Sequence, residues 1–159
     1  MNYHIRPIQP SEIPLLKDFL YEAIFIPEGV QAPPRSIIDD ESLQVYIRDF
    51  GLSPDDHCLV AEVDDKIVGA IWGRIINDYG HIADDVPSIA ISLYKEYRNQ
   101  GIGTDLLKQM ISLLKGKGYK SVSLSVQKAN YAMRMYQKAG FIVLSDDGEE
   151  VIMQCPLVS

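Results

Sequence analysis

The sequence predicts an α/β (α+β) fold in which helices flank both faces of a mixed central sheet. Segments with the two-residue period of strands alternate with segments of helical period along the 159 residues. Between residues 88 and 141, a strand pattern leads through a glycine turn into a helix, and a second strand and helix follow. Because this unit joins hairpin patterns on both sides at a common domain size, we expect a single domain, residues 1–159.

The first half of the chain is expected to form a strand, two helices and a hairpin. After a weak strand at 3–8, Ser11 is expected to cap a helix with one apolar face, made of Leu15, Leu16, Phe19, Leu20 and Ile24. Pro27-Glu28-Gly29 ends that helix. A second helix, with looser apolar spacing, is expected from about 39 to 50. Strands 58–63 and 66–76 then meet at the tight turn Asp64-Asp65.

The second half begins with a polar stretch, residues 77–87, before the central unit. We expect a strand at 88–94, a helix from the glycine turn to Lys115, and a stop at Gly116-Lys117-Gly118. A strand at 120–126 and a helix from about 129 to 138 follow, and a final hairpin pairs 141–144 with 151–155.

Composition limits the class of protein. Hydrophobic content of 47% and charged content of 23% are ordinary for a globular domain. There is no apolar run of the roughly 20 residues that a membrane helix needs, and the N-terminus lacks a signal-peptide core. Two cysteines, Cys58 and Cys155, indicate neither a disulfide scaffold nor a zinc site. We therefore expect a cytoplasmic protein with no metal and no membrane partner.

Charge is distributed unevenly around the net value of −7. Residues 95–138 hold nine Lys and Arg against two acids, for +7, whereas the rest of the chain carries six against twenty, for −14. The cationic part suits a polyanionic cofactor, and the acidic part suits a cationic acceptor such as an amine. Nucleic acid would be repelled by the acidic part, so it is not an expected partner.

The glycine turn is the candidate phosphate site. In Arg98-Asn99-Gln100-Gly101-Ile102-Gly103-Thr104, glycines precede a helix, so free backbone N–H groups and the helix dipole would face an anion. A P-loop is excluded because the chain has no two glycines five positions apart followed by Lys and Ser or Thr. A dinucleotide fingerprint is excluded because Leu106 stands where its third glycine belongs, and no acidic residue follows at the ribose position.

Two motifs together resemble the GCN5-related N-acetyltransferase family. That family's coenzyme A signature is Gln or Arg, two residues, Gly, one residue, then Gly or Ala, which is similar to the stretch from Arg98 to Gly103. Its second signature resembles the run from Asn130 through Tyr136 to Gly140-Phe141. The opening Ile5-Arg6-Pro7-Ile8 and the pair Val68-Gly69 are also similar, so the resemblance covers nearly the whole chain.

The resemblance implies a mostly antiparallel sheet, a cosubstrate and site residues. The two central strands, 88–94 and 120–126, would splay apart, and the pantetheine arm of acetyl-CoA would lie between them against the backbone near Leu93. The implied cofactor-binding residues are Leu93, Arg98, Asn99, Gln100, Gly101, Ile102, Gly103, Thr104 and Asn130. Asn130 could equally cap its helix. The implied product is an N-acetylated amine, formed by direct transfer from acetyl-CoA.

Acetyl transfer needs a neutral amine, donors for the thioester oxygen and a proton for the leaving thiolate. Tyr136 is the candidate acid, and it lies six residues after Asn130, so both can face one cleft. The base is left open between Asp84, Asp85, Glu28, His81 and solvent.

The acceptor pocket is expected between the first two helices, their connecting loop at 28–35 and the stretch 77–85, with Trp72 and Tyr79 as a wall. The acceptor would be a small-molecule or peptide amine, and a homodimer is left open. The alternatives to the enzyme are an acyl-CoA-binding sensor of the same fold without turnover, and a nucleotide-binding α/β module.

Overall fold

The computed structural model describes residues 2–76 and 81–157, where a single sheet organises the chain. In that part, seven strands are arranged in the order β1-β2-β3-β4-β5-β7-β6. Every neighbouring pair is antiparallel except β4 and β5, which run parallel. This confirms the predicted mixed sheet. The strands are β1 (His4–Pro7), β2 (His57–Val63), β3 (Lys66–Arg74), β4 (Ser88–Leu93), β5 (Ser121–Gln127), β6 (Ile142–Asp146) and β7 (Glu150–Pro156).

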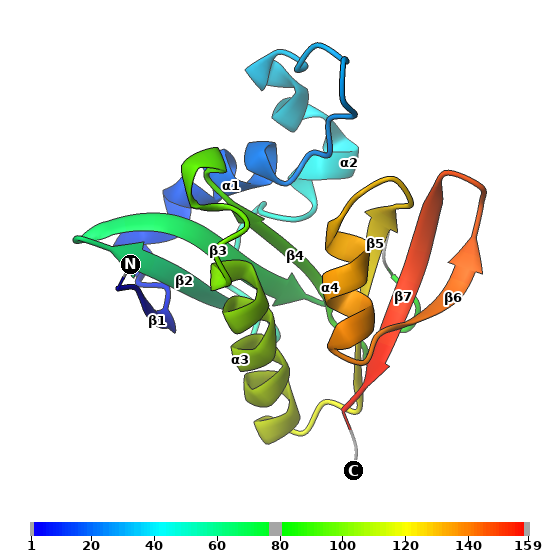
Figure 1. Cartoon of the computed structure of the whole chain (residues 1–159). Coiled ribbons are helices and arrows are strands. Elements are labelled where there is room, and N and C mark those ends of the chain that lie inside the picture. The colour runs from blue at the N-terminus through cyan, green and yellow to red at the C-terminus, as the bar shows by residue number, and fades with distance from the viewer. Residues whose placement is uncertain (1, 77–80, 158–159) are drawn as a thin grey trace.

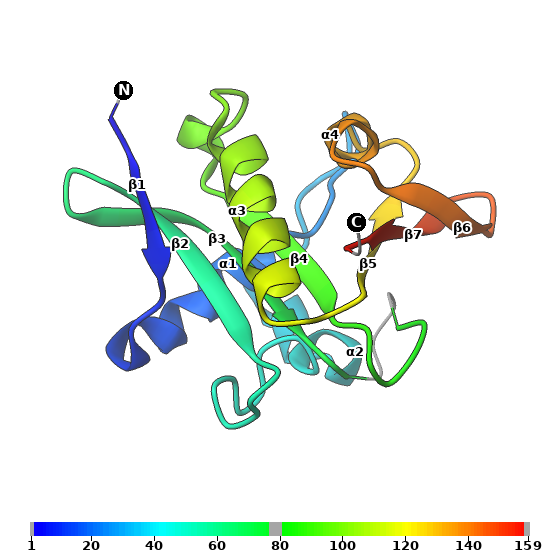
Figure 2. The same ribbon diagram turned by 90° about the horizontal axis from the view of Figure 1, so that it is seen from below.

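Helices cover both faces of the sheet, as Figures 1 and 2 show: α3 crosses one face, and α1 and α2 lie on the other. Across residues 2–76 and 81–157, no helix has the length and apolarity needed to span a bilayer. The α-helices are α1 (Leu16–Glu22), α2 (Glu41–Gln44), α3 (Ile102–Gly116) and α4 (Ala132–Lys138), and the 3₁₀ helices are η1 (Pro10–Leu15), η2 (Arg35–Asp39) and η3 (Lys95–Tyr97).

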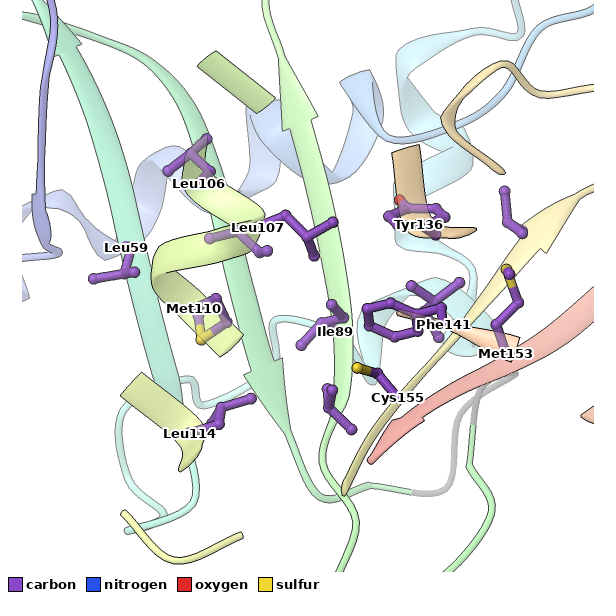
Figure 3. Packing of buried hydrophobic residues seen from close by; sticks show 14 of the residues in the cluster. Leu59, Ile89, Leu106, Leu107, Met110, Leu114, Tyr136, Phe141, Met153 and Cys155 are labelled. Atoms are coloured by element: carbon purple, nitrogen blue, oxygen red, sulfur yellow. The ribbon is translucent and has the colours of Figure 1, made fainter. Parts of the chain in front are cut away.

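Two hydrophobic cores, one on each face, hold the layers together. On the α3 face, Leu106, Leu107, Met110 and Leu114 have no exposed surface and pack over the sheet (Figure 3). Burying each such side chain contributes about 1.5–3 kcal/mol before entropy is counted. On the opposite face, Leu16, Phe19 and Leu20 of α1 join a second cluster with Val60, Ala70 and Trp72 of the sheet. Alternate residues of the same strands therefore serve both cores.

The first helix differs from the expectation at its start. Ser11 does not cap it: Glu12 Oε1 accepts from the backbone N–H of Gln9 at 2.8 Å, and a 3₁₀ turn precedes α1. The reason is Pro14, which has no N–H and clashes with the carbonyl four residues back, so regular α geometry begins only at Leu16.

The second expected helix, 39–50, is wrong in length, because α2 covers only Glu41–Gln44 before a series of turns. Side chains of β3 account for this. Trp72 Nε1 donates to the carbonyl of Tyr46 at 3.1 Å, and Arg74 Nη1 donates to the carbonyls of Val45 and Arg48 at 3.2 and 2.7 Å. These carbonyls serve tertiary contacts instead of a continued helix, and Asp49 adopts a left-handed φ of 56°.

Candidate functional site

The sheet is split at its centre. β4 and β5 share one register pair, Ser88 with Ser123, and the Ser123 N–H donates to the carbonyl of Pro87 at 3.0 Å. Beyond that point the two parallel strands separate, as the family resemblance implied. Leu93 lies at the opposite end of β4, where β5 is no longer its partner.

The backbone of Leu93 faces this split. The next residue, Tyr94, donates its N–H to Val68 of β3 at 2.9 Å. Successive residues of a strand direct their backbone groups to opposite edges, so the N–H and C=O of Leu93 point toward the β5 side. The C=O of Leu93 accepts from Arg98 Nε at 3.0 Å. A carbonyl has a second lone pair, so this edge can still pair with an amide-bearing chain.

The glycine turn brings free donors to the start of α3. Gly101 has a φ of +89°, a left-handed conformation that favours glycine, and Asn99 has a φ of 61°. Ile102, Gly103 and Thr104 form the first turn of α3, and within residues 2–76 and 81–157 no acceptor bonds their N–H groups. Together with the dipole of a 15-residue helix, these groups favour an anion.

The side chains of the predicted turn residues have different surroundings. Asn99, Gln100 and Thr104 are exposed, and Gln100 Nε2 donates to the carbonyl of Glu96 at 2.9 Å. Ile102 is only 1% exposed and belongs to the α3 core, so only its backbone can serve a ligand.

Gly103 places the glycine turn next to both β4 and α4. A Cβ at this position would lie 3.5 Å from Leu93 Cδ1 on β4 and 3.7 Å from Met135 Sδ on α4. The start of α3, the end of β4 and the residue before Tyr136 are thus within contact distance of one point. Any side chain longer than a methyl group would extend into the space between β4 and α4.

Tyr136 of α4 is the predicted acid, and it is 7% exposed. Figure 3 shows its side chain between β4 and β5, and its ring centroid lies 5.8 Å from that of Phe141. Its hydroxyl makes no hydrogen bond to any of the residues that the structure describes. Burial alone raises the pKa of Tyr136, because the phenolate would lose its hydration. A buried donor without a partner is costly, and it is available to a ligand.

Asn130 bonds the backbone just before α4, whose N-cap residue is Tyr131. Its Oδ1 accepts from the N–H of Ala132 at 2.9 Å, and α4 begins at Ala132, three residues later than the expected Ala129. A cofactor contact by Asn130 stays a prediction.

The candidate bases do not form a cluster around the split. His81 is bonded within its own loop, by Nδ1 to the carbonyl of Ile76 at 2.8 Å and by Nε2 to Asp84 Oδ1 at 3.3 Å. Asp84, Asp85 and Glu28 are exposed. Their roles stay predictions.

Sequence reasoning missed one carboxylate close to Leu93. Glu22, the last residue of α1, lies 3.3 Å through its Oε1 from Arg98 Nη2. No local pattern signals this contact, because the two residues are 76 positions apart.

The expected aromatic wall of the acceptor pocket is wrong for Trp72. Its side chain is 1% exposed in the core beneath α1, so it cannot line a pocket. Tyr79 and the rest of 77–80 lie outside the described residues. A shallow hollow does exist on the last hairpin, lined by Ser145, Asp146, Asp147, Glu150 and Ile152.

Solved structures share this fold. The PaiA N-acetyltransferase of Thermoplasma acidophilum, solved in complex with coenzyme A, has a TM-score of 0.72 at 23% identity, with 98% of this chain and 99% of that chain covered. The ribosomal-protein-S18-alanine N-acetyltransferase of Escherichia coli has a TM-score of 0.69 at 16% identity, with 99% and 96% covered. At these identities the likeness establishes the fold alone.

Curated sequences are also similar. The "Probable N-acetyltransferase camello" of Xenopus laevis is 31% identical over 91 residues, 55% of this chain and 39% of that protein. An N-alpha-acetyltransferase of Saccharolobus solfataricus is 30% identical over 105 residues, 60% of this chain and 60% of that protein. The chain thus spans less than two thirds of either relative's length. A model of the Acetyltransferase (GNAT) family matches residues 22–141, three quarters of the chain, so the chain belongs to that family.

Proposed function

We propose that this chain transfers an acetyl group from acetyl-CoA to a primary amine. The observation that carries the proposal is the buried hydroxyl of Tyr136, which has no partner in the part of the chain that the structure describes and lies beside the split between β4 and β5. Membership of an acetyltransferase family supports it. Two solved structures of the same fold, titled as complexes with coenzyme A and with acetyl-CoA, support the choice of donor.

The donor would be held by backbone more than by side chains. The N–H groups of Ile102, Gly103 and Thr104 suit the two phosphates of its diphosphate, and the edge of β4 at Leu93 suits the amides of its pantetheine arm. Bound there, the donor supplies an activated acetyl group as a thioester.

Tyr136 would provide the proton that the reaction needs. When the amine nitrogen bonds to the acetyl carbon and the C–S bond breaks, the sulfur takes the phenolic proton, and the amine's own proton returns to Tyr136 through solvent. A raised pKa suits this role, because the phenol stays protonated at neutral pH until a strong base forms beside it.

The acceptor would approach from the α1 and α2 side of the sheet. Val151 and Met153 of β7 belong to the core under α3 and α4, so Glu150 and Ile152 face the other way. The hollow that these two residues line also contains Asp147 and Asp146, and Asp146 pairs with Lys128 at 2.6 Å. Its three carboxylates outnumber this lysine, which favours a cationic amine. Because similar proteins are named for acetylating protein N-termini, we propose a peptide α-amino group as the first acceptor to test.

The test measures free thiol released from acetyl-CoA in the presence of a peptide that begins with alanine, spermidine, or buffer. Release that depends on an amine, with the N-acetylated product identified by mass, supports the enzyme. Binding of acetyl-CoA without amine-stimulated release with any acceptor would instead support the sensor. The cytoplasmic location stays a prediction that this assay does not address.

A further inference from the structure

The guanidinium of Arg98 joins the end of β4 to the end of α1. Arg98 Nε donates to the carbonyl of Leu93 at 3.0 Å, and Arg98 Nη2 donates at 3.3 Å both to the carbonyl and to Oε1 of Glu22. A cation at the carbonyl end of a helix is also favoured by the helix dipole, and Glu22 ends α1. Arg98 therefore fixes Glu22 next to the strand edge that is proposed to bind the donor.

Buried contacts with β4 hold helix α1 in this position. Ser92 Oγ donates to the carbonyl of Phe19 at 2.7 Å, and the rings of Phe19 and Tyr94 have centroids 5.0 Å apart. Phe19 has no exposed surface and stands about one helical turn before Glu22. The carboxylate thus rests on a rigid part of the fold.

Only one of the two oxygens of the Glu22 carboxylate accepts a hydrogen bond from the residues that the structure describes. Arg98 engages Oε1, whereas no residue in 2–76 or 81–157 donates to Oε2 of Glu22, and the side chain is 22% exposed. A carboxylate has about four acceptor sites, so Glu22 can accept further hydrogen bonds from a ligand that reaches it. Because Arg98 has already restricted its rotamers, binding such a ligand costs less side-chain entropy than at a free glutamate.

We propose that Glu22 binds the amino group of the acceptor and that Arg98 acts as its positioning residue. The proposal rests on the proposed function, which places the thioester near Leu93. A primary amine is a cation at neutral pH, so it is attracted to Glu22, and one guanidinium spans the distance between this carboxylate and the Leu93 carbonyl. Glu22 thus brings the amine to the thioester, and the ammonium releases one proton to solvent before its neutral nitrogen attacks the acetyl carbon.

The test compares Glu22→Gln with the wild-type chain, using the alanine peptide and spermidine as acceptors. We expect the acceptor KM to rise at least about tenfold, the effect of losing roughly 1.4 kcal/mol from a charge-assisted hydrogen bond, while the Kd of acetyl-CoA stays within about twofold. Arg98→Lys should raise the acceptor KM less than Arg98→Ala, because a lysine keeps the charge without the fork that reaches Leu93. Equal effects of the two Arg98 variants would contradict a positioning role.

The matched control is Glu62→Gln. Glu62 also pairs with an arginine, Arg6, at 3.1 Å, but it belongs to β2 and has no part in the split between β4 and β5. This variant should keep wild-type KM values for donor and acceptor. The unfolding temperature is measured for each variant, and if Glu22→Gln is unstable, Glu22→Ala replaces it with the same expected rise in the acceptor KM.

The outcomes separate the two proposals. An active wild-type chain whose acceptor KM is unchanged by Glu22→Gln would overturn the role of Glu22 and leave the proposed function standing. A wild-type chain that binds acetyl-CoA but never releases thiol with an amine would overturn both. A rise in the donor Kd equal to the rise in the acceptor KM would also overturn the inference, since Glu22 would then support the donor site.

Discussion

Replacing Tyr136 by Phe should make the protein more stable and much less active. The change removes a single oxygen atom from a side chain that is otherwise packed against Phe141 in the core. No described residue bonds that oxygen, so folding strips its water and gives nothing in exchange. Phenylalanine keeps the ring and its packing, and it avoids this cost. If Tyr136 is the acid, stability and function oppose each other at this position, as is common at active sites.

The expected changes in the free energy of unfolding and in Tm follow from the burial of the Tyr136 hydroxyl. Leaving a buried donor unsatisfied costs about 1–3 kcal/mol, so we expect the variant to gain about 1 kcal/mol in the free energy of unfolding. For a chain of this size that corresponds to a rise of roughly 2–4 °C in Tm. Loss of a general acid lowers kcat by about 10²–10⁴-fold, and we expect at least the lower figure.

Thermal unfolding without ligands and steady-state thiol release are the two assays. Tyr131→Phe is the stability control, because Tyr131 also lies beside α4 but is 85% exposed, and its Tm should not change. Since burial raises the pKa of Tyr136, the wild-type kcat should not fall between about pH 7 and 9 through loss of the phenolic proton. A lower Tm in Tyr136→Phe would mean that the hydroxyl has a partner, and a wild-type kcat would remove its role as acid.

Four further predictions concern the glycine turn and the far end of the sheet. Gly103→Leu should weaken acetyl-CoA binding more than about tenfold in calorimetry because its side chain enters the space between β4 and α4, and an unchanged Kd would reject the turn as the donor site. Gly101→Val should lower Tm, because a left-handed backbone costs about 1–2 kcal/mol at a φ of +89°. Burial lowers the pKa of His57 in the folded state, so the fold loses stability as the pH falls below the ordinary histidine pKa of about 6.5 and the buried ring is protonated. His57→Gln should flatten that part of the Tm–pH curve, and a parallel curve would contradict it. Asp56→Ala should cost about 3–5 kcal/mol in urea unfolding by leaving buried Arg74 without its 3.0 Å partner, and a loss under 1 kcal/mol would mean that the pair is solvated.

Local sequence patterns were sufficient to predict the strands and α3, because the conformation of each residue there depends on its near neighbours in the chain. α3 repeats large apolar side chains every three to four residues, and its glycine turn requires a left-handed backbone that the sequence itself indicates. The expected helix at 39–50 failed for the opposite reason. Its carbonyls bond Trp72 and Arg74, about 26 residues later in the chain, and no pattern within the segment could reveal those partners.

The same distinction applies to the site. Gly101, Gly103 and Tyr136 could be selected because each belongs to a compact motif with fixed spacing. Glu22 could not, because its position beside Arg98 depends on the docking of α1 against the end of β4. Trp72 was assigned to a pocket wall on its residue type alone, whereas the alternation of β3 turns it into the core beneath α1.

The single register pair between β4 and β5 would let the proposed donor and the proposed acceptor meet. A continuous sheet would separate its two faces completely, since backbone hydrogen bonds close every gap between neighbouring strands. Here β4 loses its β5 partner after Ser88, so a thioester bound near Leu93 from the α3 and α4 face, as proposed, would be accessible from the α1 face, where Glu22 lies. A substitution that extends the β4–β5 ladder should therefore inactivate the protein without weakening the binding of phosphate groups at the start of α3.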